Sequence, residues 1–301
     1  MRTLSELMQK ANRLGIAVPA FNVPRLPMIE PIARAVKDQG AFALIEIAQV
    51  EWQLDPAVCP PAVAAEFRRA ADPQHLRLHL DHLPAVDEAG RPADFLPVLE
   101  QALELGFHSA MIDGSALPLE ANIAATRKAA ERAHAHGVPL EAELGALLRP
   151  DEEMFSYEEF FRSGLGFTRV DETRRFVEES GCDWLSVAVG SFHGAISAAL
   201  KDQKKAEARL NLELLSELRA AAGVPLVLHG GSGVRQADVR EAVKRGITKI
   251  NVGSENRRTY DLALRETGSL EEAQEAVYQS TVSLVRDTFG ISGSLSVLNS
   301  A

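Results

Sequence analysis

Residues 76–82 read Leu-Arg-Leu-His-Leu-Asp-His, an apolar strand that carries an aspartate and a histidine side by side at its end. A carboxylate next to an imidazole can serve a metal ion and a proton transfer together, because the neutral ring nitrogen binds the ion while the carboxylate exchanges the proton. The simpler interpretation of Asp81 and His82 is a strand end with two polar residues facing water. Partners elsewhere in the chain decide between the two.

Strand-like runs of the same kind recur along the chain. They are rich in valine, isoleucine, leucine and alanine and do not alternate strictly with polar residues, as expected for strands buried on both faces. Eight strands are predicted, at 18–23, 42–48, 76–82, 109–113, 139–145, 184–190, 225–231 and 249–253. Helical periodicity lies between and after them, at 27–39, 57–71, 92–105, 119–136, 171–180, 207–222, 236–245 and 256–267.

Strict alternation of eight strands and eight helices predicts an α/β fold, a parallel (β/α)8 TIM barrel, because right-handed crossovers of this kind close readily into a ring. A doubly wound open sheet is the alternative. Residues 270–288 predict one additional C-terminal helix, and the serine- and glycine-rich residues that follow look frayed. A length of 301 residues suits one barrel, so a single domain over residues 1–301 is expected.

Composition narrows the class of protein. Hydrophobic residues make up 46% and charged residues 25%, an average balance with ample material for a core. The chain has no apolar run near the roughly 20 residues that a membrane helix needs, and its first residues lack the apolar core of a signal peptide. We therefore expect a cytoplasmic protein without membrane contact. The formal charge of −10 argues against nucleic acid as a partner.

Three of the eight histidines follow predicted strands and therefore belong to one edge of the barrel. They are His82, His193 and His229, which come after the third, sixth and seventh strands. Active-site residues of such barrels lie at the carboxyl ends of the strands. Three imidazoles that converge there are what a catalytic zinc site requires, with one position left for water or substrate. Cys59 and Cys182 show no pairing pattern, so any metal is expected to use histidine and carboxylate ligands.

Glycine-rich turns mark the same edge of the predicted barrel. One follows the seventh strand, a second ends the eighth strand, and Gly194 follows His193. Bare backbone N–H groups at the mouth of a helix suit a phosphate, although tight turns also need glycine for conformational reasons alone. Two such loops on adjacent strands predict phosphate binding at Gly230, Gly231 and Ser232 and at Asn251, Val252, Gly253 and Ser254.

These residues together resemble the class II, metal-dependent ketose-bisphosphate aldolases, which include the fructose-bisphosphate and tagatose-bisphosphate enzymes. The similarity covers nearly the whole chain as an ordered set of motifs. They are AFNV at 20–23, HLDH at 79–82, MIDGS at 111–115, LEAELG at 140–145, GSFHG at 190–194, LHGGSG at 228–233 and KINVGSE at 249–255.

The resemblance implies a role for each matching residue. His82, His193 and His229 would bind Zn²⁺, with Glu143 and Asp113 near an alternative metal position. Asp81 would be the acid/base at the aldehyde oxygen. Asn22, Gly194 and the two glycine-rich turns would bind the substrate, holding the phosphate end of dihydroxyacetone phosphate, in some members beside a sodium or potassium ion.

The long connection at 146–169 supplies the remaining carboxylates. Cleavage of a carbon–carbon bond beside a ketone leaves an enediolate, which Zn²⁺ stabilises in this family and which a second carboxylate must reprotonate at carbon. Asp151 and Glu152 are the candidates, because long loops on this face of a barrel are often lids. The alternative is a surface loop with a solvated acidic run.

The expected function is reversible cleavage of a phosphorylated ketose, similar to fructose 1,6-bisphosphate, into dihydroxyacetone phosphate and an aldehyde. Gln49, Leu83, Ala116 and the 148–150 turn replace residues usual in the family, so the aldehyde half is expected to differ. Arg149 could still supply a charge for a second phosphate, which keeps fructose 1,6-bisphosphate as the default substrate. A homodimer or homotetramer that acts on a small phosphorylated sugar is expected.

Three alternatives to a metal-dependent aldolase stay open. The first is a non-catalytic aldolase-like subunit that assists a catalytic partner. The second is a different metal-dependent barrel enzyme that acts on sugars. A Schiff-base aldolase would use Lys249, but that lysine is expected at the start of the eighth strand, away from the active edge.

Overall fold

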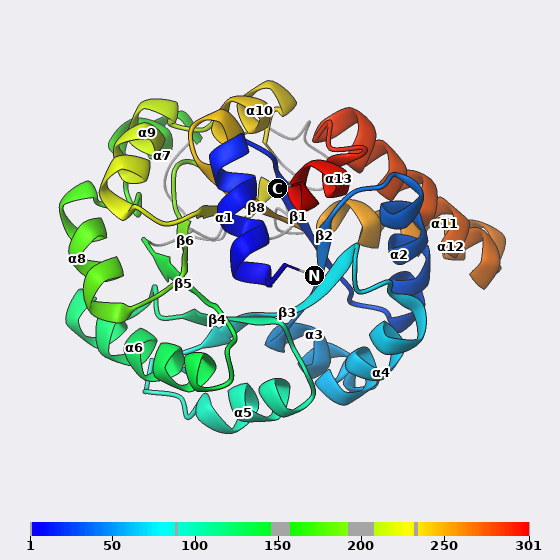
Figure 1. Cartoon of the computed structure of the whole chain (residues 1–301), viewed down its shortest axis with the longest axis horizontal. Helices are drawn as coiled ribbons and strands as arrows, with labels where there is room; N and C mark the ends of the chain where they lie inside the picture. The colour runs from blue at the N-terminus through cyan, green and yellow to red at the C-terminus, as the bar shows by residue number, and fades with distance from the viewer. Residues whose placement is uncertain (1, 88–89, 146–156, 192–207, 232–233, 301) are drawn as a thin grey trace.

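Eight parallel strands form the centre of the computed structural model, which describes residues 2–87, 90–145, 157–191, 208–231 and 234–300. Each strand pairs with the next in sequence, and β1 pairs with β8, so the sheet closes into a barrel (Figure 1). This closure confirms the predicted TIM barrel and excludes the open sheet. The strands are β1 (Val18–Asn22), β2 (Ala43–Ala48), β3 (Leu76–Pro84), β4 (Ser109–Asp113), β5 (Leu140–Leu144), β6 (Trp184–Val187), β7 (Leu226–Leu228) and β8 (Ile247–Val252).

Helices surround the barrel at the predicted places. They are α2 (Ile29–Asp38), α4 (Pro60–Ala70), α5 (Leu96–Glu104), α6 (Leu119–Ala135), α8 (Val170–Ser180), α9 (Leu212–Ala222), α10 (Gln236–Lys244) and α11 (Ser254–Thr267). The predicted C-terminal helix is α12 (Leu270–Ser283), which continues as a π-helical turn over Leu284–Thr288. Short helices α3 (Gln49–Leu54) and α7 (Tyr157–Ser163) were not predicted. Among the residues described, no helix is both long and apolar enough to cross a bilayer.

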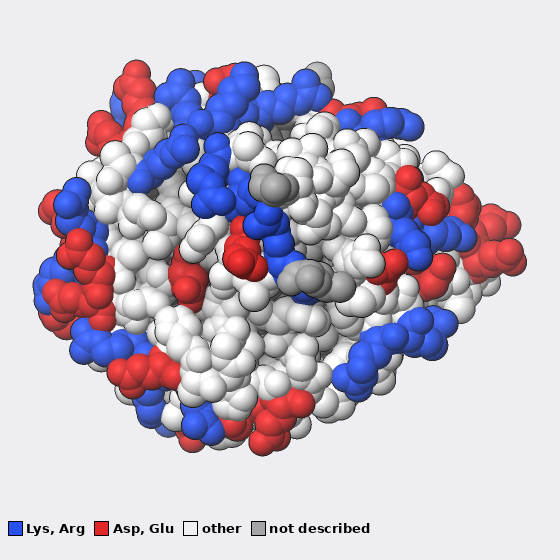
Figure 2. Space-filling view, in the orientation of Figure 1, with Lys and Arg blue, Asp and Glu red and all other residues white. Residues whose placement is uncertain are grey.

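Helix α1 (Leu4–Leu14) lies across the N-terminal mouth of the barrel (Figure 1). Thr3 and Glu6 form a capping box at its start, and Gly15 ends it with a φ of 63°, a left-handed conformation that favours glycine. Its buried face, with Leu7 and Met8, packs onto apolar residues of the strands. Figure 2 shows this end of the molecule, where charged groups of both signs alternate with broad uncharged areas.

Helix α13 (Ser294–Asn299) completes the closure of this mouth. Leu295 and Leu298 are buried in the same cluster as α1, and Lys10 donates hydrogen bonds to Ser300. The expectation that the last residues fray is therefore wrong for the part that the structure describes. Serine and glycine lower the local helix propensity, but the burial of two leucines outweighs it.

Replacement of Leu298 by alanine tests whether α13 contributes to stability. The side chain is fully buried, so Leu298→Ala should lower the free energy of unfolding by about 2–4 kcal/mol. Val297 is the matched control, because its side chain is 46% exposed on the same helix and Val297→Ala should change stability by less than about 0.5 kcal/mol. Urea unfolding of the two variants measures the difference, and equal values would show that α13 is not docked.

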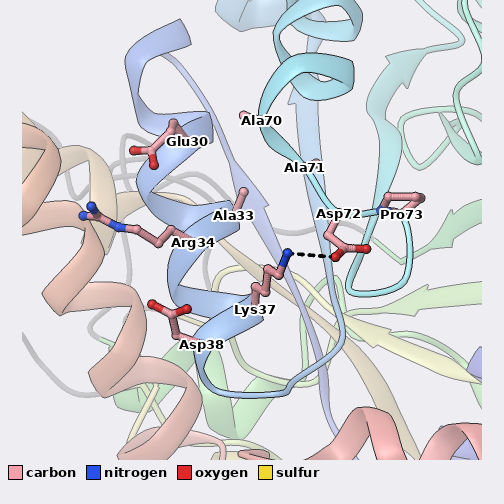
Figure 3. Close-up of a pocket in the computed structure, with 9 residues that line it drawn as sticks. All are labelled: Glu30, Ala33, Arg34, Lys37, Asp38, Ala70, Ala71, Asp72 and Pro73. Atoms are coloured by element: carbon pink, nitrogen blue, oxygen red, sulfur yellow. Dashed lines mark ion pairs between the residues drawn. The ribbon is translucent and has the colours of Figure 1, made fainter.

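One outer pocket, of about 470 Å³, lies between α2 and the turn before β3, at the end of the barrel opposite the predicted site (Figure 3). Within the described residues, four of its five charged side chains are paired, all except Glu30. Lys37 lies 3.1 Å from Asp72, and Arg34 and Asp38 contact residues of α12. Because these charges offset one another, we read the pocket as the solvated surface between two helices.

Candidate active site

Strand β3 delivers two neighbouring side chains to the C-terminal rim. Successive residues of a regular strand point to opposite faces, so Asp81 and His82 would normally diverge. The pairing of β3 with β4 shifts register between Leu80 and Leu83, and His82 has a φ of 39°, the one positive φ at a non-glycine residue in the described chain. Such a bulge re-aims a side chain, at a backbone cost on the order of 1–3 kcal/mol.

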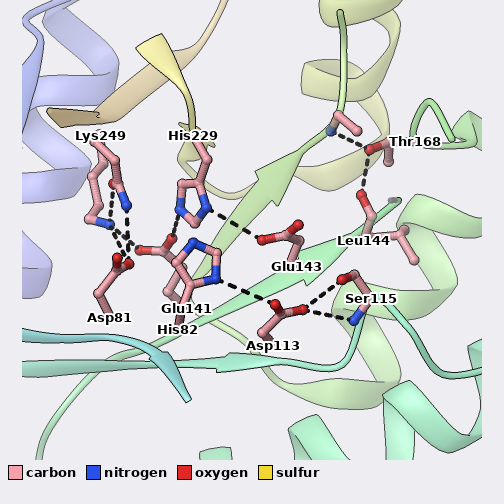
Figure 4. Close-up of polar contacts among 12 residues, drawn as sticks. Asp81, His82, Asp113, Ser115, Glu141, Glu143, Leu144, Thr168, His229 and Lys249 are labelled. Carbon is pink, nitrogen blue, oxygen red and sulfur yellow. Dashed lines mark hydrogen bonds and ion pairs between the residues drawn. The ribbon is translucent and has the colours of Figure 1, made fainter. Parts of the chain in front are cut away.

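Two of the three predicted histidine ligands meet above the barrel (Figure 4). The rings of His82 and His229 lie with their centroids 4.6 Å apart, in an edge-to-face arrangement. His82 Nδ1 is 3.4 Å from Asp113 Oδ2, and His229 Nδ1 is 3.4 Å from Glu143 Oε2. Residues predicted from strands three, four, five and seven therefore converge at one place.

The donor set at this place fits a divalent metal ion. Imidazole nitrogens and carboxylate oxygens are ligands that Zn²⁺ accepts. Ligand atoms of Asp81, His82 and His229 lie within 4.8 Å of one another, as do those of His82, Asp113 and Glu143. Oε2 of Glu143 is buried and lies 3.4 Å from His229 Nδ1, so this carboxylate oxygen stands within the cluster.

The electrostatics of the cluster also favour a cation. Burial on its own lowers the pKa of His82, but Asp81 and Asp113 raise it to about 10. Burial and the charge of His82 lower the pKa of His229, yet the carboxylates of Glu141 and Glu143 raise it to about 9. The surrounding negative charge thus attracts protons strongly, and a metal ion that binds the imidazoles would displace them.

Asp81 is held in a defined orientation. Asn22 Nδ2 donates to its Oδ2 at 3.2 Å, and Asn251 Nδ2 donates to its Oδ1 at 3.1 Å. Burial acts to raise the pKa of Asp81, but the positive charges of His82 and Lys249 shift it well below its usual range. The carboxylate is therefore ionised and can accept a proton from a substrate hydroxyl.

Lys249 lies closer to the site than the sequence suggested. Strand β8 begins at Ile247, so Lys249 is in its interior, and its fully buried side chain points into the barrel. Its Nζ is 3.0 Å from Glu141 Oε2 and 3.1 Å from Glu46 Oε2. Burial acts to lower the pKa of Lys249, but these carboxylates raise it above its usual range. A permanently charged ammonium is a poor nucleophile, which counts against a Schiff base.

The predicted phosphate loops lie side by side at the rim. Gly230 has a φ of 70°, and a Cβ on Gly231 would come within 2.8 Å of Ile250 Cγ2, so both positions require glycine. Helix α11 begins at Ser254, directly after Val252 and Gly253. The amide of Asn251 faces inward, where it contacts Lys249 and Asp81. The Asn251 side chain is thus occupied within the barrel, and phosphate binding by the backbone of this loop stays a prediction.

Five predicted site residues lie outside the described residues. They are Asp151, Glu152, His193, Gly194 and Ser232. Their roles stay predictions.

Several side chains around the site were not predicted. Ser115 donates from its backbone N and its Oγ to Asp113 Oδ1, which turns Oδ2 toward His82. Glu141 Oε1 lies 2.9 Å from His229 Nε2 and fixes that ring from below. Glu141 stands two positions before the predicted residue Glu143, and Lys249 stands two positions before Asn251. Residues two apart on a strand share a face, so all four side chains point to the interior of the barrel.

Comparisons with known proteins agree with this geometry. The chain is 31% identical to a fructose-bisphosphate aldolase of Streptococcus pyogenes, over 91% of this chain and 85% of the relative. It is 29% identical to a probable fructose-bisphosphate aldolase of Bacillus subtilis, over 96% of this chain and 98% of the relative. The crystal structure of the YdjI aldolase from Escherichia coli K12 superposes with a TM-score of 0.76 at 26% identity, covering 98% and 100% of the two chains.

A family profile decides the assignment. The profile described as "Fructose-bisphosphate aldolase class-II" matches residues 2–294. Metal dependence is general in that family, and the described residues contain three groups that can hold a metal ion. The chain therefore belongs to the class-II fructose-bisphosphate aldolase family and is a carbon–carbon lyase.

Proposed function

We propose that this aldolase uses Zn²⁺ to cleave a phosphorylated ketose reversibly into dihydroxyacetone phosphate and an aldehyde. The observation that carries the proposal is the convergence of Asp81, His82 and His229 at one point of the rim, next to the loops at Gly230 and Val252. A proton acceptor, metal ligands and a phosphate-binding edge are the parts that such a cleavage needs.

The chain's own residues divide the work. When bound, the metal ion would polarise the ketose oxygens and stabilise the negative charge left after cleavage. His82 and His229 would hold the ion, and Asp113 and Glu143 orient the two rings. Asp81 accepts the proton of the hydroxyl at the cleaved bond. The amides of Asn22 and Asn251 keep that carboxylate aimed during the transfer.

A retro-aldol screen tests this function most directly. Phosphorylated ketoses are incubated with the protein in the presence and absence of Zn²⁺, and release of dihydroxyacetone phosphate is followed. We expect zinc-dependent release from at least one ketose. A non-catalytic subunit would release none, and a sugar isomerase would yield another sugar in place of the triose. The presence of an acid/base, Asp81, beside His82 and His229 favours a catalytic protein. A non-catalytic subunit that assists a partner needs no acid/base.

A loop carboxylate is proposed to transfer the carbon-bound proton. Asp151 and Glu152 are the candidates, and exchange of the C3 proton of dihydroxyacetone phosphate with deuterated solvent isolates this half-reaction. The variant that removes the true donor, Asp151→Asn or Glu152→Gln, should lose about 10²–10⁴-fold in exchange. Full exchange in both variants would assign the step to another residue.

The aldehyde half is proposed to lack a second phosphate. Glu51 Oε2 accepts a hydrogen bond from Ala48 N at 2.7 Å, and Ala48 is the register partner of Asp81. Burial, with the charge of Asp81, raises the pKa of Glu51 to about 7. A carboxyl group here can bond to sugar hydroxyls, and its ionised form repels a phosphate.

We therefore expect a higher kcat/KM for ketose 1-phosphates with uncharged tails than for fructose or tagatose 1,6-bisphosphate. Glu51→Gln should improve relative cleavage of the bisphosphates by roughly tenfold, since one polar contact contributes about 1–3 kcal/mol. Glu271→Gln on the outer helix α12 is the control. Cleavage of a bisphosphate near 10⁵ M⁻¹s⁻¹, with much slower cleavage of the other ketoses, would contradict this prediction.

A further inference from the structure

A second group of potential ligands lies one layer below the rim, inside the barrel. Ligand atoms of Glu46, His79 and Asp81 lie within 4.8 Å of one another, and all three side chains are buried. Considered alone, this group could hold a second metal ion. The ammonium of Lys249, however, lies 3.1 Å from Glu46 Oε2 and 3.9 Å from Asp81 Oδ1. The chain thus already places a fixed cation among these ligands.

From this position Lys249 contacts two partners that lead up to the rim (Figure 4). Its Nζ donates to Asn251 Oδ1 at 2.7 Å, and Asn251 Nδ2 donates to Asp81 Oδ1 at 3.1 Å. Its Nζ also lies 3.0 Å from Glu141 Oε2, and Glu141 Oε1 lies 2.9 Å from His229 Nε2. One buried ammonium is therefore connected to both the acid/base and a metal ligand.

The contact with Asn251 determines which end of the amide faces the site. An ammonium can only donate hydrogen bonds, so it selects the oxygen of the amide. The nitrogen must then point toward Asp81, where it donates to the carboxylate. Without Lys249 the amide could turn its oxygen toward Asp81, and two acceptors would face each other.

The contact with Glu141 acts in the same way on the metal side. A ligating histidine usually donates its other ring N–H to a carboxylate, which fixes the ring and its tautomer. Glu141 has this position beneath His229, with Nδ1 of the ring on the side of Glu143. Lys249 Nζ lies 3.0 Å from Oε2 of the fully buried Glu141, so it holds that oxygen and leaves Oε1 directed at His229.

We propose that Lys249 is a positioning residue, an internal cation that orients the proton acceptor Asp81 through Asn251 and the metal ligand His229 through Glu141. Its effect on turnover rests on the proposed function, whereas its effect on metal affinity does not. It also follows that the layer of Glu46, His79 and Asp81 binds no divalent ion, because the ammonium of Lys249 stands among these ligands.

The test compares Lys249→Met, which keeps the length of the side chain without the charge, with Lys10→Met. Lys10 is a second buried lysine, at the opposite end of the barrel, where it bonds to Ser300. In the full-length protein, Zn²⁺ affinity is measured by competition with a chelating dye, and kcat and KM with the best ketose of the screen. Lys249→Met should weaken Zn²⁺ binding and lower kcat, each by about 10–100-fold, with a smaller change in KM. Lys10→Met should change neither.

A double variant separates orientation from simple charge balance and also guards against a failure to fold. Lys249→Met with Glu46→Gln removes one positive and one negative charge, so the interior should tolerate it. We expect it to fold and still to show the low kcat and weak Zn²⁺ binding, because Asn251 and Glu141 remain without their donor. Recovery of both values to within threefold of wild type would reduce Lys249 to charge balance and overturn the proposal.

Three further outcomes are decisive. Unchanged Zn²⁺ affinity and kcat in Lys249→Met would also reject the proposal. If the wild-type protein cleaves none of the ketoses, the proposed function fails, and the Zn²⁺ titration alone then decides the role of Lys249. A Zn²⁺ ion found between Glu46 and His79 in a crystal of the zinc-loaded protein would contradict the prediction for the lower layer.

Discussion

Treatment with a chelator should abolish carbon–carbon cleavage, and added Zn²⁺ should restore it. His82 and His229 are the described imidazoles of the site, and loss of one leaves an incomplete set of ligands. His229→Ala should therefore lower kcat/KM by several orders of magnitude. Metal content, measured on the purified variant, should fall with the activity. We expect the same loss for His193→Ala, since the family resemblance assigns that residue to the same ion.

A surface histidine provides the control for this prediction. His134 pairs with Asp183 at the protein surface, so His134→Ala should retain both zinc and activity. Borohydride should trap no covalent adduct with substrate, because the charged ammonium of Lys249 does not attack a carbonyl. A trapped adduct, or full activity of the metal-free protein, would rule out a metal-dependent mechanism.

Replacement of Asp81 by asparagine should lower kcat by about 10²–10⁴-fold while zinc content and KM change little. The amide keeps the shape of the side chain but removes the proton acceptor. Steady-state kinetics on zinc-loaded protein, with the metal content measured in parallel, separate the loss of the base from a loss of the ion.

Asp171→Asn is the matched control for the same substitution. Asp171 is an exposed residue of α8 that pairs with Arg169, so its variant should match wild type. A rate for Asp81→Asn within a few-fold of wild type would show that another group moves the proton.

Much of the fold and part of the site could be predicted from the sequence, for a definite physical reason. Parallel barrel strands are buried on both faces and appear as apolar runs, and their carboxyl ends share one rim. His82 and His229 could therefore be placed together although they are far apart in the chain. The two-residue period of a strand would also have placed Glu141 and Lys249 beneath Glu143 and Asn251.

Other features have no such local signal. The bulge at His82 depends on the register between β3 and β4, which is set by contacts between distant segments. Helix α13 is stabilised by leucines that pack against α1, at the other end of the chain. Glu51 lies near Asp81 and His82 because the short helix α3 begins directly after β2, and no pattern in the sequence predicts this six-residue helix.

The closure of the N-terminal mouth by α1 and α13 has a consequence for the timing of proton exchange. In the described chain that end of the barrel is filled with apolar side chains, so we expect protons and water to reach the Lys249 layer from the C-terminal rim. The proposed ketose binds at that same rim and would stand in this path. The interior would then keep, throughout a turnover, the protons that it held when the substrate arrived, and would equilibrate with the solvent again only when a product leaves.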